Sequence, residues 1–357
     1  MIHVFSALKG LLQGKKIYID HWVFRLHYRF TVLLLLFFCI IVSTKQYAGE
    51  PIKCSPDLRV YSAVVDTYCF ITTTYTVQTA MNLTPSQGAP HPGVSSSQDE
   101  SNYIYHAYYQ WIGFLLFFQS VLFYFPHWLW KNFEGGKLSW LLERDIRFCS
   151  KEEKNKCKDL IISHLRTIWH IDSTYIFKYF LCEILCLVNL IGQMMLLDLV
   201  LNGQFYSFGI EAVHYLRNYT NLKSNPFLKV FPRVTSCTFR YFGETGKVRS
   251  VSVLCILAIN IVNEKIFLIL WFWFIILLII TSLAFIARVV IFFFKAVLLH
   301  FFRLNFRVLR PDDLRVITET GNMSNLLFVY FLGKNMEHNY FNDVIMDFVA
   351  ILQGKAH

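Results

Sequence analysis

Long apolar segments alternate with polar segments along this chain. Windows of about 20 mainly apolar residues, long enough to cross a bilayer as a helix, lie at Tyr28–Tyr47, Tyr108–Trp130, Tyr179–Leu201 and Ile266–Phe294. One such window is also compatible with a buried core helix of a soluble domain. Four windows separated by polar loops instead predict a four-pass membrane protein, with both chain ends on one side.

These spans divide the chain into nine segments, and we predict an all-α fold built on a bundle of four transmembrane helices. The predicted segments are the N-terminal segment 1–27, the spans 28–47, 108–130, 179–201 and 266–294, the extracellular loops 48–107 and 202–265, the cytoplasmic loop 131–178 and the cytoplasmic C-terminal region 295–357. Apolar residues recur in both cytoplasmic segments, as in 160–162 and 341–352, so we expect a helical cytoplasmic layer.

Composition and charge agree with this topology. Only 16% of the residues are charged and 55% are hydrophobic, whereas soluble proteins carry about 25% charged residues. The net charge of +10 comes from basic residues scattered through the loops, which does not predict nucleic-acid binding. Lys and Arg before the first span and after the second favour a cytoplasmic N-terminus. Loop 202–265 is also basic, but loops of this length influence orientation only weakly.

Cysteine placement supports the same orientation. Cys54 and Cys69 lie in the first extracellular loop, and Cys237 and Cys255 lie in the second. In the oxidising exterior these four thiols can form two disulfides with three alternative connectivities. Unpaired structural cysteines are the other interpretation. Glycosylation sequons at Asn82 and Asn218 fall in the same loops, which is weak support for their exposure.

Two features inside the spans are candidates for function. Pro126 cannot donate to the carbonyl of Leu122, so the second span should kink there, and this kink is either a gating hinge or a static bend. Glu183 and Asp198 lie in the third span, where ionisable groups indicate a water-filled pathway by default. Both also lie near span ends, where they can reach interfacial water.

The second span carries a specific signature. Tyr108-Tyr109-Gln110-Trp111 is followed by Phe117-Phe118-Gln119 and by Tyr124-Phe125-Pro126-His127-Trp128-Leu129-Trp130-Lys131. This segment resembles the second transmembrane helix of innexins, the subunits of invertebrate gap junctions. Further matches are Val23-Phe24-Arg25-Leu26-His27-Tyr28, Gln46-Tyr47, Asp66-Thr67-Tyr68-Cys69, Asn260-Ile261-Val262-Asn263-Glu264-Lys265-Ile266 and Trp271-Phe272-Trp273-Phe274. The resemblance covers nearly the whole chain. It leaves open whether a cellular genome or an insect virus that carries innexin homologues encodes the chain.

The resemblance implies a disulfide pairing and an assembly. Cys54 would pair with Cys255 and Cys69 with Cys237, while Phe70 stands where the family usually has Trp. Protomers, of this chain alone or with other innexins, would form an octameric hemichannel in the plasma membrane. It would dock to a hemichannel on the apposed cell and pass ions and small metabolites passively.

The first thirteen residues predict a short amphipathic helix. Its apolar face consists of Ile2, Val4, Phe5, Leu8, Leu11 and Leu12. In innexins such a helix folds into the pore mouth, which makes Ile2, Phe5 and Lys9 candidates for lining the pore. The alternative is a helix lying on the cytoplasmic leaflet.

Two other functions stay open, a hemichannel that never docks and a four-pass adhesion protein. The chain lacks the loop motifs of claudins and tetraspanins, which disfavours adhesion. It also contains no metalloprotease, nucleophile-elbow or phosphate-loop motif, so we predict no enzyme activity, no cofactor and no metal.

Overall fold

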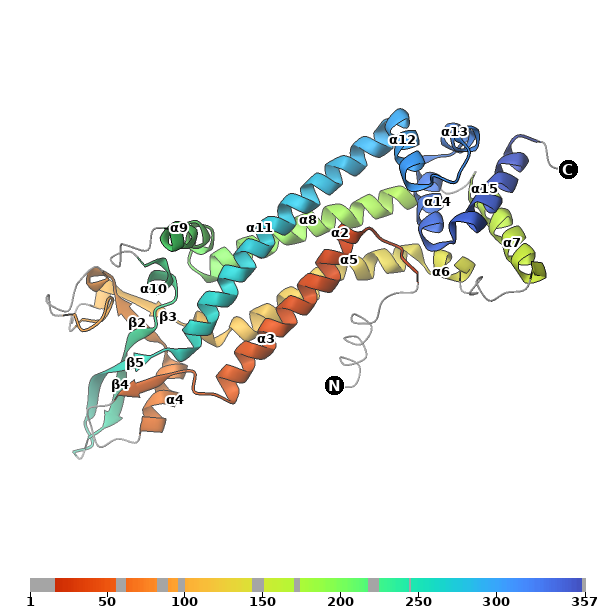
Figure 1. Cartoon of the computed structure of the whole chain (residues 1–357). Helices are drawn as coiled ribbons and strands as arrows, with labels where there is room; N and C mark the ends of the chain where they lie inside the picture. Colours follow the sequence, from red (N-terminus) through yellow and green to blue (C-terminus); the bar gives the residue numbers. More distant parts are fainter. Residues whose placement is uncertain are drawn as a thin grey trace. The chain divides into compact units, whose positions relative to one another are not determined.

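A computed structural model describes residues 17–55, 62–81, 89–95, 100–142, 151–169, 174–217, 225–243 and 245–354. Helices predominate, and one antiparallel sheet accompanies them (Figure 1). Within these described residues, four helices are long and apolar enough to cross a membrane, namely Trp22–Tyr47, Ile112–Glu134, Tyr175–Val200 and Ala258–Phe293. The predicted helical fold with four spans is therefore confirmed.

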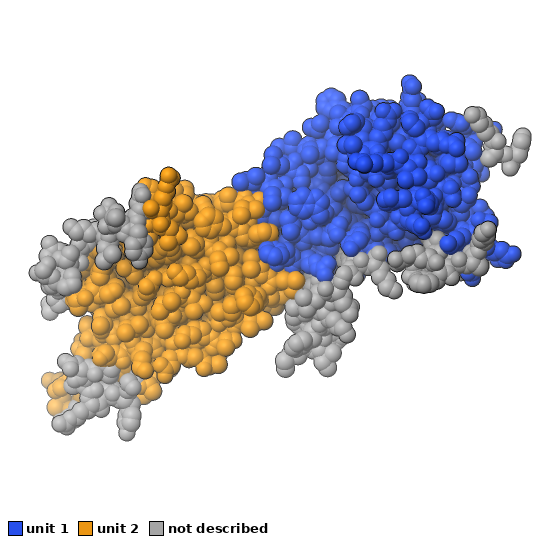
Figure 2. Space-filling model, viewed as in Figure 1, with its two compact units in different colours: residues 1–31, 122–189, 277–357 blue, residues 32–121, 190–276 orange. Residues whose placement is uncertain are grey.

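The first of these helices has three parts, α2 (Trp22–Arg25), the π-helix η1 (Leu26–Thr31) and α3 (Val32–Tyr47). The others are α5 (Ile112–Glu134), α8 (Tyr175–Val200) and α11 (Ala258–Phe293). The chain forms two compact units (Figure 2). By their residue ranges, all four long helices contribute residues to both units. Unit 1 comprises residues 1–31, 122–189 and 277–357, and unit 2 comprises residues 32–121 and 190–276.

Helix α11 begins eight residues before its apolar window, because its first turns contain polar residues with partners. Asn260 and Glu264 are fully buried. The Asn260 amide donates to the carbonyl of Pro232 at 2.8 Å, and the Glu264 carboxylate accepts from Arg233. A hydropathy window scores these residues as loop, since it does not register that their polar groups are satisfied.

Unit 2 contains a five-stranded antiparallel sheet that the sequence analysis did not anticipate. Its order is β1-β5-β4-β2-β3. The strands are β1 (Lys53–Ser55), β2 (Thr74–Val77), β3 (Tyr103–His106), β4 (Val234–Phe242) and β5 (Val248–Ile256). Strands β4 and β5 form a long hairpin whose turn includes Gly246 at a φ of +71°, a conformation that favours glycine. The alternation of side chains along these two strands and this glycine between them were the sequence features that could have predicted the hairpin.

Short helices complete unit 2. They are α4 (Ser62–Thr72), α9 (Phe205–Arg217), α10 (Pro226–Val230) and the 3-10 turns η2 (Gln78–Ala80), η4 (Glu100–Asn102) and η5 (Tyr108–Gln110). The structure thus places Tyr108–Gln110, predicted as the start of the second span, in a turn that precedes α5.

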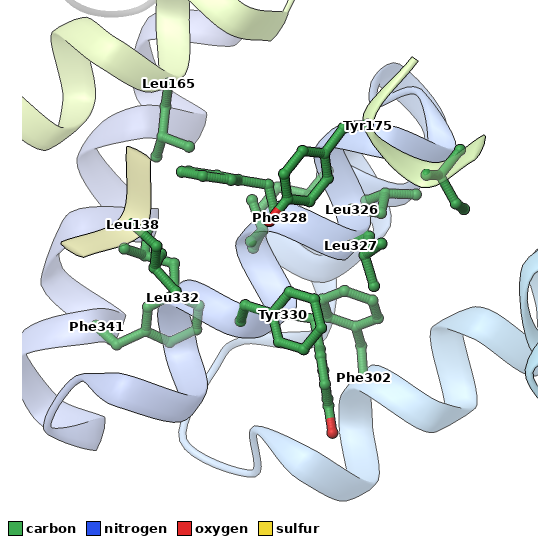
Figure 3. Packing of buried hydrophobic residues seen from close by; sticks show 14 of the residues in the cluster. Leu138, Leu165, Tyr175, Phe302, Leu326, Leu327, Phe328, Tyr330, Leu332 and Phe341 are labelled. Carbon is green, nitrogen blue, oxygen red and sulfur yellow. The ribbon is translucent and has the colours of Figure 1, made fainter. Parts of the chain in front are cut away.

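Unit 1 contains the expected helical layer. Its helices are α6 (Lys137–Leu142), α7 (Lys151–Trp169), α12 (Lys295–Asn305), α13 (Pro311–Thr320), α14 (Met323–Asn335) and α15 (His338–Leu352). Every residue of α14 from Ser324 to Gly333 is buried, as expected for a helix with neighbours on all sides. Figure 3 shows Phe328, Tyr330 and Leu332 of α14 among side chains from other helices of this layer. Burial of each such side chain contributes about 1.5–3 kcal/mol, so α14 is the core of the layer.

Candidate functional site

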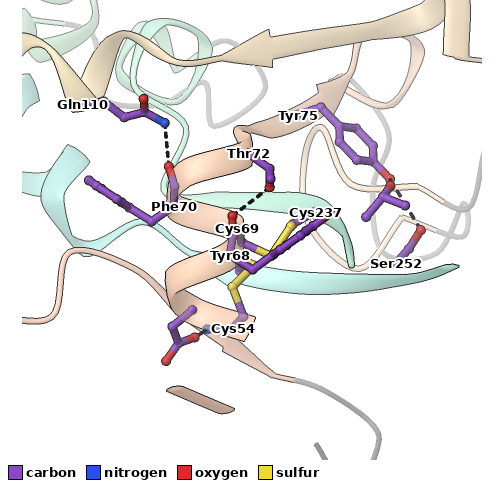
Figure 4. Close-up of a disulfide and its surroundings, with 12 residues drawn as sticks. Cys54, Tyr68, Cys69, Phe70, Thr72, Tyr75, Gln110, Cys237 and Ser252 are labelled. Atoms are coloured by element: carbon purple, nitrogen blue, oxygen red, sulfur yellow. Dashed lines mark hydrogen bonds between the residues drawn. A yellow bond between two sulfur atoms is a disulfide. The ribbon is translucent and has the colours of Figure 1, made fainter. Parts of the chain in front are cut away.

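Two disulfides join segments of unit 2 that come from opposite halves of the chain, and Figure 4 shows the one between Cys69 and Cys237. Cys54 of β1 is bonded to Cys255 of β5, and Cys69 of α4 is bonded to Cys237 of β4. This is the pairing that the family resemblance implies. The Sγ atoms of Cys54, Cys69 and Cys255 lie within 4.8 Å of one another because the two disulfides are neighbours. Sulfurs bonded in this way offer no thiolate to a metal.

Hydrogen bonds reinforce the connection that these two disulfides make. The Asp66 carboxylate accepts from the backbone N–H of Cys54 at 2.6 Å, which ties the start of α4 to β1. The Tyr75 hydroxyl lies 3.5 Å from the Ser252 hydroxyl and so links β2 to β5 (Figure 4). Strands β1, β2, β4 and β5 and helix α4 are therefore cross-linked into one layer.

The Tyr-Tyr-Gln-Trp signature connects this layer to α5. The Gln110 amide donates to the carbonyl of Phe70 at 2.5 Å, and the Tyr108 hydroxyl donates to the carbonyl of Val230 at 3.1 Å. Tyr109 is fully buried with its ring 5.4 Å from that of Phe70, so the Phe that stands in place of the usual Trp still packs as an aromatic. Trp111 differs from the other three, since its side chain is exposed.

Part of the basic surplus of residues 202–265 is neutralised within unit 2. Arg233 donates to both carboxylate oxygens of Glu264, with a shortest distance of 2.7 Å, and the Lys265 ammonium lies 3.1 Å from the same carboxylate. Glu264 is completely buried, so its charge requires these partners. The arrangement fixes the entry of the chain into α11.

His106 is expected to make the sheet of unit 2 less stable in acid. Burial lowers the pKa of His106 from 6.5 to about 4, and its Nε2 lies 2.8 Å from the Thr76 hydroxyl. Because the unfolded chain takes up this proton at higher pH than the folded chain, stability should fall as pH drops from 6.5 to about 4. The expected loss is about 3 kcal/mol. We would measure the melting temperature of the solubilised protein at pH 7 and at pH 4.5.

The matched variant is His106→Gln, whose amide can still reach Thr76 but does not titrate. We expect it to lose much less stability than the wild type between these pH values. An equal loss in both proteins would mean that other groups set the acid sensitivity.

In unit 1 the segment before the first span is held at several points. Trp130 Nε1 donates to the carbonyl of Ile19 at 2.9 Å. Asn335 of α14 bonds Tyr18 twice, accepting from its N–H at 2.6 Å and donating to its carbonyl at 2.7 Å. Residues 18–19 are thus fixed to both α5 and the helical layer.

Asp20 adds a buried ionic contact to the same segment. Its carboxylate lies 3.2 Å from Arg25 Nε and 3.5 Å from His127 Nδ1, and Asp20 and His127 are both buried. The His127 ring stacks on Tyr28 at a centroid distance of 3.6 Å. His127 and Trp130 belong to the signature of the second span, so that signature contacts the N-terminal segment at one end of α5 and α4 at the other.

The two acidic residues of the third span have structural partners. Glu183 is buried and its Oε1 lies 2.9 Å from Nη1 of Arg288 in α11, so its carboxylate has a charged partner within the protein. Asp198 accepts from the N–H groups of Phe205 and Tyr206 at 2.9 and 3.4 Å, so it caps the start of α9. Sequence reasoning singled out both acids but did not identify these partners.

Several predicted site residues lie outside the described part of the chain. These are the pore-lining candidates Ile2, Phe5 and Lys9 and the glycosylation candidates Asn82 and Asn218. Pro126 is described, and α5 is assigned as one helix from Ile112 to Glu134 with this proline inside it.

Comparison with known proteins gives a consistent result. The innexin family model matches residues 20–352. Innexin shaking-B of Drosophila melanogaster is 38% identical over 359 residues, with 100% of this chain and 96% of that protein covered. Innexin inx2 of Schistocerca americana is 36% identical over 359 residues, with 99% of each protein covered. Innexin inx1 of Drosophila melanogaster is 34% identical over 361 residues.

Proposed function

Because this chain belongs to the innexin family, whose members are gap junction channel subunits and not enzymes, we propose that it assembles as an octameric hemichannel and docks to a hemichannel on the apposed cell. The complete channel then passes ions and small metabolites by diffusion. The pair of adjacent disulfides in unit 2 carries this proposal. A docking surface must keep its shape while it is exposed to water, and covalent links between β1, α4 and the β4–β5 hairpin supply that rigidity.

The proposed topology puts the disulfide-linked layer outside the cell and both chain ends in the cytoplasm. Disulfides persist in oxidising compartments, which supports an extracellular position for loops 48–107 and 202–265. The helical layer of segments 131–178 and 295–357 is then cytoplasmic. Asn82 and Asn218 would be open to glycosylation on the outer side.

In this assembly the N-terminal helix narrows the pore, with Ile2, Phe5 and Lys9 facing the permeating ions. The anchoring of Tyr18, Ile19 and Asp20 supports this role. It gives the preceding residues a fixed starting point beside the first span.

Pro126 is the proposed hinge for gating. Replacing it with Ala supplies an N–H to the carbonyl of Leu122, and a hydrogen bond of about 1 kcal/mol favours the straight helix. We expect Pro126→Ala to change the ratio of open to closed hemichannels by about fivefold. Single-channel recording of open probability measures this directly.

A proline at a helix start provides the control. Pro311 is the first residue of α13, where no intrahelical hydrogen bond is missing, so Pro311→Ala should leave open probability unchanged. An unchanged open probability in Pro126→Ala as well would assign Pro126 to a static bend.

Assembly and permeation can be tested without docking. Purified protein should show eightfold symmetry in projection images of single particles. Single cells expressing the chain should take up a small fluorescent dye. Monomeric particles and no dye uptake, despite protein at the cell surface, would contradict the pore and favour an adhesion protein.

A further inference from the structure

Helix α9 (Phe205–Arg217) presents an apolar stripe that the channel function above does not use. Tyr206, Ile210 and Val213 are 40%, 64% and 41% exposed, and their spacing puts them on one helical face. The opposite side packs into unit 2 through Phe205, Phe208 and Ala212, which are fully buried. Phe208 contacts the rings of Phe227 and Phe231 at 5.6 and 5.3 Å. The stripe is therefore not the inner face of the helix.

The position of α9 in the chain puts this stripe at a membrane surface. Helix α8 is one of the four helices able to cross the membrane, and it ends at Val200, five residues before α9 begins. Asn202 and Gly203 turn the chain with φ angles of 52° and 76°. The Asp198 carboxylate at the end of α8 accepts from the first N–H groups of α9. This turn keeps α9 at the level where the span leaves the bilayer.

The orientation of α9 also matches the bilayer surface. In Figure 1 α9 is seen nearly end-on, while the neighbouring ends of α8 and α11 run along the page, so α9 lies across them. Gly209 permits a close approach to α11, because a Cβ at this position would lie 2.1 Å from the Trp271 ring. A helix that crosses the spans lies along the plane of the membrane.

The side chains around the stripe fit a lipid interface. Ser207, Glu211 and His214 are exposed on the flank that faces away from the buried side, and His214 and Arg217 occupy the last turn. Aromatic and aliphatic residues on one face with polar and basic residues beside them are typical of helices that lie in the headgroup region. We infer that α9 is an interfacial helix whose stripe of Tyr206, Ile210 and Val213 inserts into the lipid leaflet at the C-terminal end of α8.

Photocrosslinking in liposomes tests this inference on the full-length chain. Ile210→benzoylphenylalanine is reconstituted with radiolabelled phosphatidylcholine and illuminated, and the protein band is assayed for lipid label. Glu211→benzoylphenylalanine is the matched control, since position 211 lies on the polar flank. We expect several-fold more lipid label at position 210 than at position 211.

Two other outcomes would overturn the inference. A crosslinked band of twice the mass at position 210, without lipid label, would place a second copy of the chain on the stripe. Equal and low labelling at both positions would mean that the stripe faces water. Neither outcome bears on docking or permeation, because the assay needs only a chain inserted in the membrane.

Discussion

Loss of the disulfide between Cys69 and Cys237 is expected to abolish cell-to-cell coupling. Its two cysteines are fully buried, and the bond joins α4 to the β4–β5 hairpin across 168 residues of sequence. Removing a native disulfide costs about 2–5 kcal/mol. We expect a cost near the lower limit of this range, because the remaining Cys54–Cys255 bond still shortens the loop that the Cys69–Cys237 bond closes. Junctional conductance between paired cells measures the result in Cys69→Ser.

Two further variants make this prediction specific. Cys69→Ser with Cys237→Ser removes the thiol that could otherwise mispair, and it should behave like the single variant. Cys39→Ser changes a free cysteine whose Sγ donates to the carbonyl of Gly113 at 3.3 Å, a role that a hydroxyl can fill, so coupling should persist. Normal coupling in the double variant would show that the Cys69–Cys237 disulfide is dispensable for docking.

The second large effect is expected at the buried ion pair of Arg288 and Glu183. Arg288→Met leaves the Glu183 carboxylate without its cation in a site where its side chain is only 3% exposed. Breaking a buried pair on one side costs about 3–5 kcal/mol. We therefore expect a marked fall in the melting temperature of the solubilised protein. Size-exclusion chromatography after heating measures this fall.

A second substitution should reverse this loss. Glu183→Leu combined with Arg288→Met removes both charges, and replacement of a buried pair by apolar residues is often neutral. Arg315→Met removes the exposed partner of Glu319 and should leave the melting temperature unchanged, since surface pairs contribute little. If the double variant were as unstable as Arg288→Met, the loss would come from packing around Arg288 and not from the stranded charge.

The helical part of this fold follows from hydropathy, because each span is a long apolar run. Hydropathy did not predict the start of a helix where polar residues are hydrogen-bonded inside the protein. Asn260 and Glu264 lie in the first two turns of α11 although hydropathy places them in a loop. Their partners Pro232 and Arg233 lie in the turn between α10 and β4. Such pairings depend on the tertiary fold, so a window of neighbouring residues cannot predict them.

The sheet of unit 2 was missed for a related reason. Strand β1 is three residues long and pairs with β5, which lies about two hundred residues later in the chain. No local sequence pattern therefore predicts this strand. The cysteine positions did point to a link between these loops, but their pairing came from the family resemblance. The roles of His127 and Trp130 likewise depend on contacts with Asp20 and Ile19 that the signature itself does not reveal.

Junctional conductance between two voltage-clamped cells that both express this chain is the most direct test of the proposed intercellular channel. Pairs in which only one cell expresses the chain provide the control. We predict a conductance well above that control, with transfer of a small dye between the cells. Dye uptake by single cells without junctional conductance, despite protein at the cell contact, would contradict docking and leave a hemichannel that opens only to the exterior.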